Sequence, residues 1–224
     1  MTRSPLAIDV FSDVVCPWCF IGKRRLEKAV ALRPDIPVDM HYRPYFLNPW
    51  VPREGMSRVD YLTAKFGSPE RYEKIALRVA QAAANEGLTY NIGTIARQPN
   101  TLDCHRLILW AGRIGKAAQV KQRLMEIYFS DGGDLSDRDV LVQAASDCGL
   151  DPAEVRNLLA GDADIASVEQ AAKSAQGAGI DGVPFYVFGN VLAVSGAQAP
   201  EYLAGAIERA ASELAKSAAL SPSA

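Results

Sequence analysis

The chain has 224 residues, of which 49% are hydrophobic and 22% are charged. Its 24 lysine and arginine residues nearly balance its 26 acidic residues, which gives a net charge of −2. This composition is too apolar and too weakly charged for a disordered protein, and the lack of a basic cluster argues against a nucleic-acid groove or a membrane-docking face. A chain of this length buries a sizeable core, so its four cysteines are not needed as disulfide staples.

The amino-terminal residues favour a cytoplasmic location. No run in the sequence approaches the roughly 18 consecutive apolar residues of a membrane-spanning helix. Asp9 and Asp13 fall where a secretory signal peptide would carry its apolar region. We therefore expect a soluble cytoplasmic protein. In that reducing compartment, paired cysteines indicate redox chemistry or metal binding more often than structural disulfides.

The amino-terminal part of the chain predicts a β-α-β unit. Residues 6–11 form a short run with β-branched and aromatic side chains, which is typical of a buried strand. Pro17 suits the first turn of the helix that follows, because its missing N–H costs little there. Pro34 and Pro37 close this helix, and residues 38–43 favour a second strand.

The middle of the chain changes from strand patterns to helix patterns, with clear punctuation between the helices. The first expected helix ends at Gly87 and carries an apolar stripe of Tyr72, Ile75, Ala76, Val79 and Ala83. The second is capped by Asn100-Thr101 and carries an apolar stripe of Cys104, Leu107, Ile108 and Ala111. Three more helices are expected between Ser136 and Gly149, from Asp151-Pro152 onwards, and over residues 165–178. This block indicates a helical insertion.

Strand patterns return near the carboxyl end. Residues 184–188 and 191–194 favour two strands joined by a hairpin turn at Gly189-Asn190. An alanine-rich helix is expected over residues 200–220, and residues 221–224 are expected to fray. The outer parts of the chain together predict β-α-β followed by β-β-α.

Cys16 and Cys19 form a Cys-x-x-Cys pair between the first strand and its helix. At a helix start, unpaired N–H groups and the helix dipole stabilise a thiolate, and the pKa of a thiol falls from ~8.5 to roughly 3.5–7.5 in such settings. We expect Cys16 to be ionised, reachable by solvent and the nucleophile. Cys19 lies on the apolar stripe of the helix and suits the resolving role, in which it releases the product from a mixed disulfide on Cys16.

Two other interpretations of the pair stay open, namely half of a zinc site and inert packing. Zinc requires two further ligands, and the candidates are scattered without a second close pair. These candidates are Cys104, Cys148, His41 and His105. We therefore favour redox chemistry and expect no metal.

The other cysteines and the histidines give weaker evidence for a functional role. Cys104 and Cys148 each lie on an apolar helical stripe and are expected to pack as small hydrophobes, with a second redox pair left open. His105 could face a cleft or satisfy a local hydrogen bond, and the second is favoured over a role as general base. His41 lies within a predicted strand, and Asn48 is interpreted as a turn residue.

Four segments in this order are similar to those of one known family. They are Cys16-Pro17-Trp18-Cys19, Asn100-Thr101-Leu102-Asp103, Gly182-Val183-Pro184 and Val194-Ser195-Gly196-Ala197-Gln198. Over nearly its whole length the chain resembles the DsbA-like thiol oxidoreductases of the FrnE type. The resemblance implies an α/β thioredoxin fold over residues 1–50 and 180–224, interrupted by an all-helical domain over residues 51–179.

The resemblance also implies the roles of four residues beside the cysteines. Pro17 and Trp18 would shape the active turn, while Val183 and a cis Pro184 would form the substrate ledge. Because proline donates no N–H, the Val183 backbone would be free to pair with an extended substrate. Trp18 stands where periplasmic members have a histidine, so a cation that would stabilise the thiolate is missing from the motif. This difference argues against strong oxidising power.

We therefore expect a thiol–disulfide oxidoreductase that acts on a disulfide- or dithiol-containing protein or small molecule. No bound cofactor is expected, and glutathione is left open as reductant or co-substrate. The related 2-hydroxychromene-2-carboxylate isomerases and kappa-class glutathione transferases, which have a serine near the position of Cys16, provide a second hypothesis of glutathione-dependent isomerase or transferase chemistry. A non-catalytic binding module is the third. The sequence sets neither the substrate, the direction of electron flow nor the oligomeric state.

Overall fold

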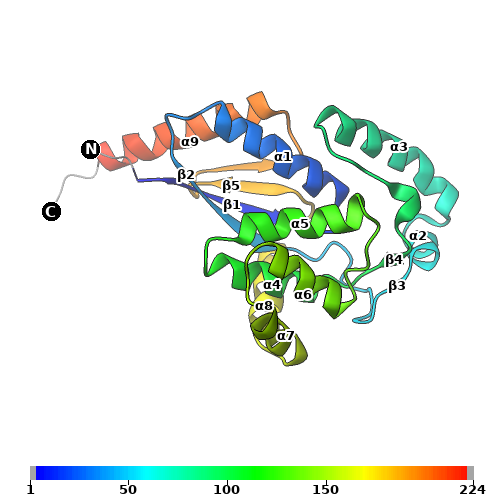
Figure 1. Ribbon diagram of the computed structural model, residues 1–224. Helices are drawn as coiled ribbons and strands as arrows, with labels where there is room; N and C mark the ends of the chain where they lie inside the picture. Colours follow the sequence, from blue (N-terminus) through cyan, green and yellow to red (C-terminus); the bar gives the residue numbers. More distant parts are fainter. Residues whose placement is uncertain (1–3, 221–224) are drawn as a thin grey trace.

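A mixed four-stranded sheet lies at the centre of the computed structural model, which describes residues 4–220 (Figure 1). Its strands are β1 (Leu6–Ser12), β2 (Val38–Pro44), β5 (Phe185–Phe188) and β6 (Leu192–Ser195), in the order β2-β1-β5-β6. The central strand β1 pairs parallel with β2 and antiparallel with β5, and β5 and β6 form an antiparallel hairpin. Phe11 lies opposite Phe185, so the end of β1 lies beside the start of β5.

Helices cover both faces of this sheet (Figure 1). On one face lie α1 (Pro17–Ala31) and α9 (Pro200–Leu220), where Leu26 and Ala29 share a buried cluster with residues of α9. The elements between β2 and β5 are β3 (Met56–Ser57), α2 (Arg58–Phe66), α3 (Pro69–Asn85), the 3-10 helix η1 (Ile92–Thr94), β4 (Arg97–Gln98), α4 (Leu102–Gly112), α5 (Ala117–Phe129), α6 (Arg138–Asp147), α7 (Pro152–Ala160) and α8 (Ile165–Gly177).

The predicted order of strands and helices is confirmed, and the structure contains further elements in the middle block. Helices α2 and α5 were not predicted, and the two-residue strands β3 and β4 pair within a block expected to be entirely helical. The Gly189-Asn190 turn is present, with positive φ at both residues as a tight hairpin requires. The predicted domain boundaries stay predictions, and residues 221–224 lie outside the described part of the chain.

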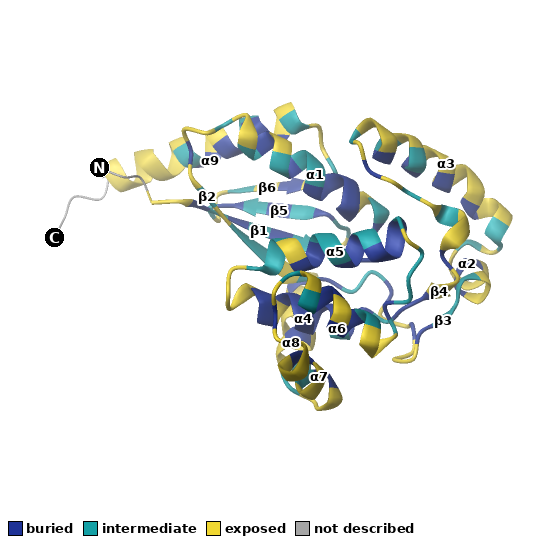
Figure 2. Cartoon of the chain, viewed as in Figure 1, coloured by how far each residue is buried: buried dark blue, intermediate teal, exposed yellow. Residues whose placement is uncertain are grey.

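The largest buried cluster joins the start of α1 to the helices of the middle block (Figure 2). Cys16, Cys19 and Phe20 belong to the same cluster as buried residues of α4, α5, α6 and α7. The rings of Phe20 and Phe129 stack with their centroids 5.4 Å apart, which ties α1 to the end of α5. The helical block therefore shares its core with the cysteine end of the thioredoxin-like part. Within residues 4–220, no helix has the length and apolar character needed to cross a membrane.

Gly22 allows α1 to approach the segment that leads into β5. A Cβ atom at this position would lie 2.8 Å from Cγ of Pro184 and would also overlap the Tyr186 hydroxyl. Both neighbours are buried, so neither can move aside freely. The missing side chain at Gly22 thus brings α1 and Pro184 together.

We predict that Gly22→Ala destabilises the protein by about 1–3 kcal/mol, because the added methyl group overpacks a buried contact. Gly205→Ala in α9 is the matched control, since apart from its chain neighbours and the nearby backbone of its own helix no atom lies within 4 Å of the position its Cβ would take. Ala is favoured over Gly inside a helix by roughly 0.5–1 kcal/mol, so Gly205→Ala should be neutral or stabilising. Urea unfolding measures both variants, and equal stability of the two would contradict the packing argument.

Candidate active site

Cys16 and Cys19 lie at the amino-terminal end of α1, directly after the turn that follows β1. Cys16 occupies the N-cap position with extended backbone angles, and Pro17 takes the first helical position as predicted. This placement directs the free N–H groups and positive dipole end of α1 towards the Cys16 region. Both cysteines are free thiols.

Both thiols are buried. Cys16 is 3% exposed and Cys19 is 1% exposed, whereas Trp18 is 38% exposed. The expectation that Cys16 would be reachable by solvent is therefore wrong for this conformation. Cys16 is buried because the helical block packs over the start of α1 and completes the core cluster to which Cys16 belongs.

The environment shifts the pKa values of the two thiols in opposite directions. The pKa of Cys16 is lowered, chiefly by a hydrogen bond from the Cys19 side chain and further by backbone amides of Cys19 and Trp18, while burial opposes the shift. The pKa of Cys19 is raised well above its ordinary value, first by burial and then by its interactions with Cys16. Cys16 therefore ionises first, and Cys19 keeps its proton.

Val183 and Pro184 lie beside Cys16, on the segment before β5. The Cys16 thiol donates a hydrogen bond to the carbonyl oxygen of Val183 at 3.5 Å. The Val183–Pro184 peptide bond is cis. The Pro184 carbonyl accepts a hydrogen bond from the Gly196 N–H at 2.8 Å, whereas the Val183 N–H has no hydrogen bond partner within residues 4–220. The structure thus places Val183 and Pro184 beside the Cys16-Pro17-Trp18-Cys19 motif.

Two buried charged residues behind the cysteines were not predicted as part of the site. Asp13 is fully buried and accepts a hydrogen bond from the Leu47 N–H at 2.8 Å. Burial alone would raise the pKa of Asp13, but its contacts with His105 and Leu47 lower it overall. Burial lowers the pKa of Lys121 on α5 to about 8, and its largest opposing interaction is with Cys19. Asp13 and Lys121 thus place one acid and one base in the core.

The sequence contains one signal that could have found Lys121. It shares a helix face with Leu124, Met125 and Tyr128, which follow it at three, four and seven positions. A lysine within such an apolar stripe is unusual, because lysine is almost never fully buried unless it is paired. Asp13 gave no comparable signal.

A second lysine of the helical block interacts with Cys16. Lys65 on α2 donates a hydrogen bond to Oδ1 of Asn48. Burial lowers the pKa of Lys65, and its electrostatic interactions with Cys16 and Asp13 oppose that shift. The expectation from Trp18 concerned the motif, which carries no cation between the cysteines; Lys65 lies outside it.

The other predicted candidates have mixed outcomes. His105 is buried, but its Nε2 atom lies 3.4 Å from Oδ1 of Asp13, so its partner is distant in sequence and not local as favoured. Asn48 does lie in a turn and also accepts from Tyr61 and Lys65. His41 makes contacts with Asp9 and Asp39 near the surface.

The two remaining cysteines are free thiols. Cys104 is fully buried in the core cluster as predicted, and half-buried Cys148 packs against the same cluster. Burial raises the pKa of both thiols. Neither is activated as Cys16 is.

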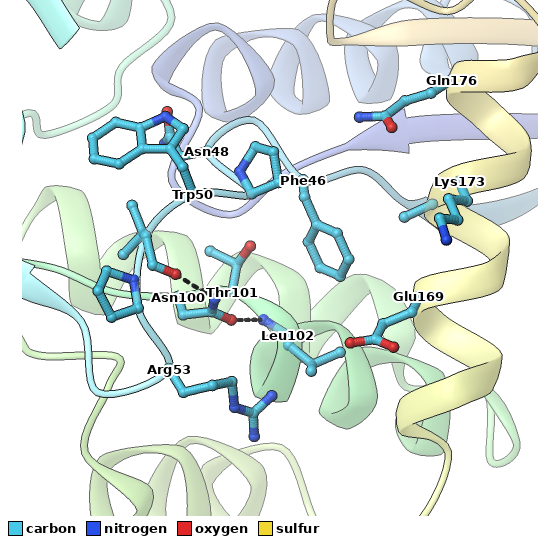
Figure 3. Close-up of a pocket in the computed structure, with 14 residues that line it drawn as sticks. Phe46, Asn48, Trp50, Arg53, Asn100, Thr101, Leu102, Glu169, Lys173 and Gln176 are labelled. Atoms are coloured by element: carbon cyan, nitrogen blue, oxygen red, sulfur yellow. Dashed lines mark hydrogen bonds between the residues drawn. The ribbon is translucent and has the colours of Figure 1, made fainter. Parts of the chain in front are cut away.

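One cavity has no cysteine in its lining. It has a volume of about 670 Å³ and is bounded by the segment after β2, the start of α4 and one side of α8 (Figure 3). Phe46, Trp50, Arg53 and Lys173 contribute side chains to its wall. Asn48 and the segment Asn100-Thr101-Leu102 line it, whereas the residues predicted for catalysis and substrate binding do not. In residues 4–220, no three His, Cys, Asp or Glu side chains are grouped as metal ligands would be.

The pattern of residues 7–208 matches the family described as DSBA-like thioredoxin domain. The chain belongs to this family. Its match covers most of the sequence and includes both cysteines, Val183 and Pro184. The predicted relationship to DsbA-like proteins is therefore confirmed, while assignment to the FrnE type stays a prediction.

Individual relatives agree with this membership. A probable DsbA oxidoreductase from Streptomyces coelicolor is 33% identical, with a TM-score of 0.86 over 93% of this chain and 91% of that one. The YwbO protein of Bacillus subtilis (strain 168) is 25% identical over 186 residues, which are 83% of this chain and 88% of that protein. The cytosolic disulfide reductase DsbM from Pseudomonas aeruginosa, solved with GSH, has the same fold at 18% identity, with a TM-score of 0.60 over 94% of this chain and 98% of that one.

For this DSBA-like chain we predict that the alkylation rate of Cys16 rises with pH to a midpoint below the ~8.5 of a free thiol. Cys19→Ala should move the midpoint upwards, because the Cys19 hydrogen bond is the largest cause of the lowered pKa. Iodoacetamide labelling of the reduced protein, followed by mass spectrometry of the Cys16 peptide, measures the midpoint. Cys148→Ser is the control and should leave it unchanged. If Cys19→Ala left the midpoint unchanged, the assignment of the Cys19 hydrogen bond as the main cause of the lowered Cys16 pKa would be wrong.

Proposed function

We propose that this DSBA-like protein is a thiol–disulfide oxidoreductase of the cytoplasm, with Cys16 as nucleophile and Cys19 as resolving thiol. The observation that supports the proposal most directly is the placement of Cys16 at the N-cap of α1, with its thiol 3.5 Å from the Val183 carbonyl oxygen beside the cis Pro184. The opposite pKa shifts of Cys16 and Cys19 agree with it. A nucleophile must be ionised before it attacks, and a resolving thiol must stay protonated until a mixed disulfide has formed. The pKa of Cys16 is shifted in the direction that a nucleophile needs, and the pKa of Cys19 in the direction that a resolving thiol needs.

The exchange proceeds in two balanced steps. The Cys16 thiolate attacks one sulfur of a substrate disulfide, the substrate S–S bond breaks, and the departing sulfur leaves as a thiolate that takes a proton from water. Cys19 then loses its proton and attacks Cys16, which forms the Cys16–Cys19 disulfide and expels the second substrate thiolate. The substrate gains two electrons and the protein loses two. The same steps in reverse oxidise a substrate dithiol.

The residues around the pair support binding of an extended substrate. When Cys16 ionises, its hydrogen bond to the Val183 carbonyl is lost, so that carbonyl becomes available to a substrate N–H. The Val183 N–H, which is unpaired in the described residues, can donate to a substrate carbonyl. We assign Val183 and Pro184 as the substrate ledge, with Pro17 and the exposed Trp18 as the outer edge of the site.

After the protein has reduced a substrate, a cellular thiol must reduce the Cys16–Cys19 disulfide before the next turnover. We propose glutathione or another small thiol for this role, because exchange with two low-molecular-weight thiolates returns the pair to its dithiol form. The DsbM structure with GSH shows that this fold has been solved with such a molecule. No resident cofactor is part of the proposal.

We predict that Cys16→Ser reduces catalysed insulin reduction to the uncatalysed background, because a serine hydroxyl cannot form the mixed disulfide. Cys148→Ser is the matched control and should retain wild-type activity, since Cys148 is the C-cap residue of α6, has a raised pKa and takes no part in the exchange. Circular dichroism confirms that both variants are folded. Wild-type activity in the folded Cys16→Ser protein would end the proposal.

Cys19→Ser separates this proposal from the two other hypotheses. A dithiol mechanism predicts that the variant stops at the mixed disulfide, which mass spectrometry detects. Tight glutathione binding together with isomerisation of a chromene carboxylate by the same variant would favour the isomerase hypothesis. A ligand held equally by the wild type and the double Cys16→Ser/Cys19→Ser protein, without turnover, would favour a binding module.

A further inference from the structure

Arg25 on α1 connects three segments that are distant in the sequence. Its Nε atom donates a hydrogen bond at 2.7 Å to Oε1 of Glu86, the C-cap residue of α3. Its Nη1 atom donates at 2.6 Å to the carbonyl oxygen of Ala197, in the segment after β6. Helix α1, the end of α3 and the segment that leads from β6 to α9 lie side by side (Figure 1). One guanidinium group thus holds the helical block and this segment against α1.

The ion pair between Arg25 and Glu86 is largely shielded from water. The side chain of Arg25 is 20% exposed and that of Glu86 is 8% exposed, so salt and water screen their attraction less than that of a surface pair. The second oxygen of Glu86, Oε2, accepts from Nζ of Lys28 at 2.7 Å. Because arginine presents its donors in a rigid planar fork, a bond at Nε also fixes the direction of Nη1. Glu86 therefore orients the guanidinium group towards Ala197.

The segment that Arg25 holds also supports the substrate ledge. The Gly196 N–H donates to the Pro184 carbonyl at 2.8 Å, which extends the pairing of β5 with β6 as far as the ledge. Gly196 has a φ of 82°, in the left-handed region that glycine adopts at little cost, and the chain bends there. Ala197 and Val183 both pack against the largest buried cluster. The ledge and the Arg25 contact are therefore one residue apart along this segment.

The Ala197 carbonyl depends on Arg25 for its hydrogen bond. No second donor reaches this oxygen from the described part of the chain. Arg25 lies three positions after Gly22, so the two face the same side of α1. Gly22 lets Pro184 approach the helix, and Arg25 holds the segment that follows β6. Helix α1 thus supports the ledge at two points, a close contact and a charge-assisted hydrogen bond.

Resting on the proposed function, we propose that Arg25 is a positioning residue that fixes the Val183–Pro184 ledge for an extended peptide substrate. The guanidinium group holds the Ala197 carbonyl, and the neighbouring Gly196 N–H holds the Pro184 carbonyl. The N–H and carbonyl groups of Val183 then stay in place for pairing with a peptide strand. Loss of the guanidinium group lets the ledge move, which weakens pairing with a peptide and leaves the chemistry of the sulfurs unchanged.

The test compares two mixed disulfides that release the same coloured thiolate, 2-nitro-5-thiobenzoate. One joins it to the single cysteine of a linear peptide of about ten residues, and the other joins it to 2-mercaptoethanol, which has no peptide bond to pair with the ledge. Attack by Cys16 of the reduced full-length protein expels the coloured thiolate from either, and stopped-flow absorbance gives both second-order rate constants. For Arg25→Met we expect the peptide constant to fall by about tenfold and the 2-mercaptoethanol constant to change by less than about twofold, because misplacement of a binding edge by about 1 Å costs up to about 10²-fold.

Lys28→Met is the matched control, because it removes the other cation from Glu86 and leaves the Ala197 contact intact. It should change neither rate constant. Arg25→Lys should restore part of the peptide constant, since one ammonium group can bind the Ala197 carbonyl but cannot bridge both partners as the fork does. The alkylation midpoint of Cys16 should be the same in all variants, because Arg25 is not among the main influences on its pKa. A shifted midpoint would place Arg25 in the thiolate chemistry and overturn a positioning role.

Equal losses for the two disulfides in a folded Arg25→Met protein would show a general loss of structure and overturn the proposal, as would an unchanged peptide constant. If circular dichroism shows that Arg25→Met is unfolded, Glu86→Ala replaces it. This variant frees the guanidinium group to rotate and should lower the peptide constant alone. A wild type that reacts with both disulfides but no faster with the peptide would also overturn the role of the ledge. A wild type that reacts with neither faster than a free thiol would instead overturn the proposed function.

Discussion

The site depends on the formation of one negative charge inside a closed core. A buried thiolate loses its hydration, and only hydrogen bonds, dipoles or nearby cations can replace the lost stabilisation. At the start of α1 this compensation comes from the helix end and from the Cys19 thiol, which donates to Cys16 only while it keeps its own proton. Ionisation of one sulfur thus requires the other to stay neutral, and this asymmetry gives the two cysteines different roles in the proposed exchange.

The helical block is part of this site as well as a cover over it. Its residues complete the core around Cys16 and Cys19, and His105 on α4 contacts the carboxylate of Asp13. The next residue, Arg106, is fully buried and donates to the carbonyl oxygens of Leu158, Gly161 and Ala163. Because these carbonyls belong to α7 and the turn before α8, one guanidinium group fixes α4 relative to both. The position of His105 therefore depends on packing far from the cysteines.

The sequence predicted what is local and missed what depends on tertiary contacts. The Cys-x-x-Cys pair between a strand and a helix and the Gly189-Asn190 hairpin depend on neighbouring residues, and both predictions are confirmed. Helix α5 was missed because its N-cap, Lys116, makes no side-chain capping bond and therefore gives no start signal. Lys121 was missed with its helix. The burial of Cys16 could not be predicted from the motif, because the residues that cover it come from helices much later in the chain.

The charges that act on the two sulfurs also come from outside the motif. Pro17 and Trp18 carry no charge, whereas Lys65 on α2 interacts with Cys16 and Lys121 on α5 interacts with Cys19. A cation near a thiolate favours the reduced form of the pair, and its effect increases as the surroundings lose water. Both lysines belong to the segment between β2 and β5, so in the proposed exchange that segment contributes to the balance between the reduced and oxidised states. In the proposed exchange, the dipeptide between the cysteines is therefore not the sole influence on the redox balance of the pair.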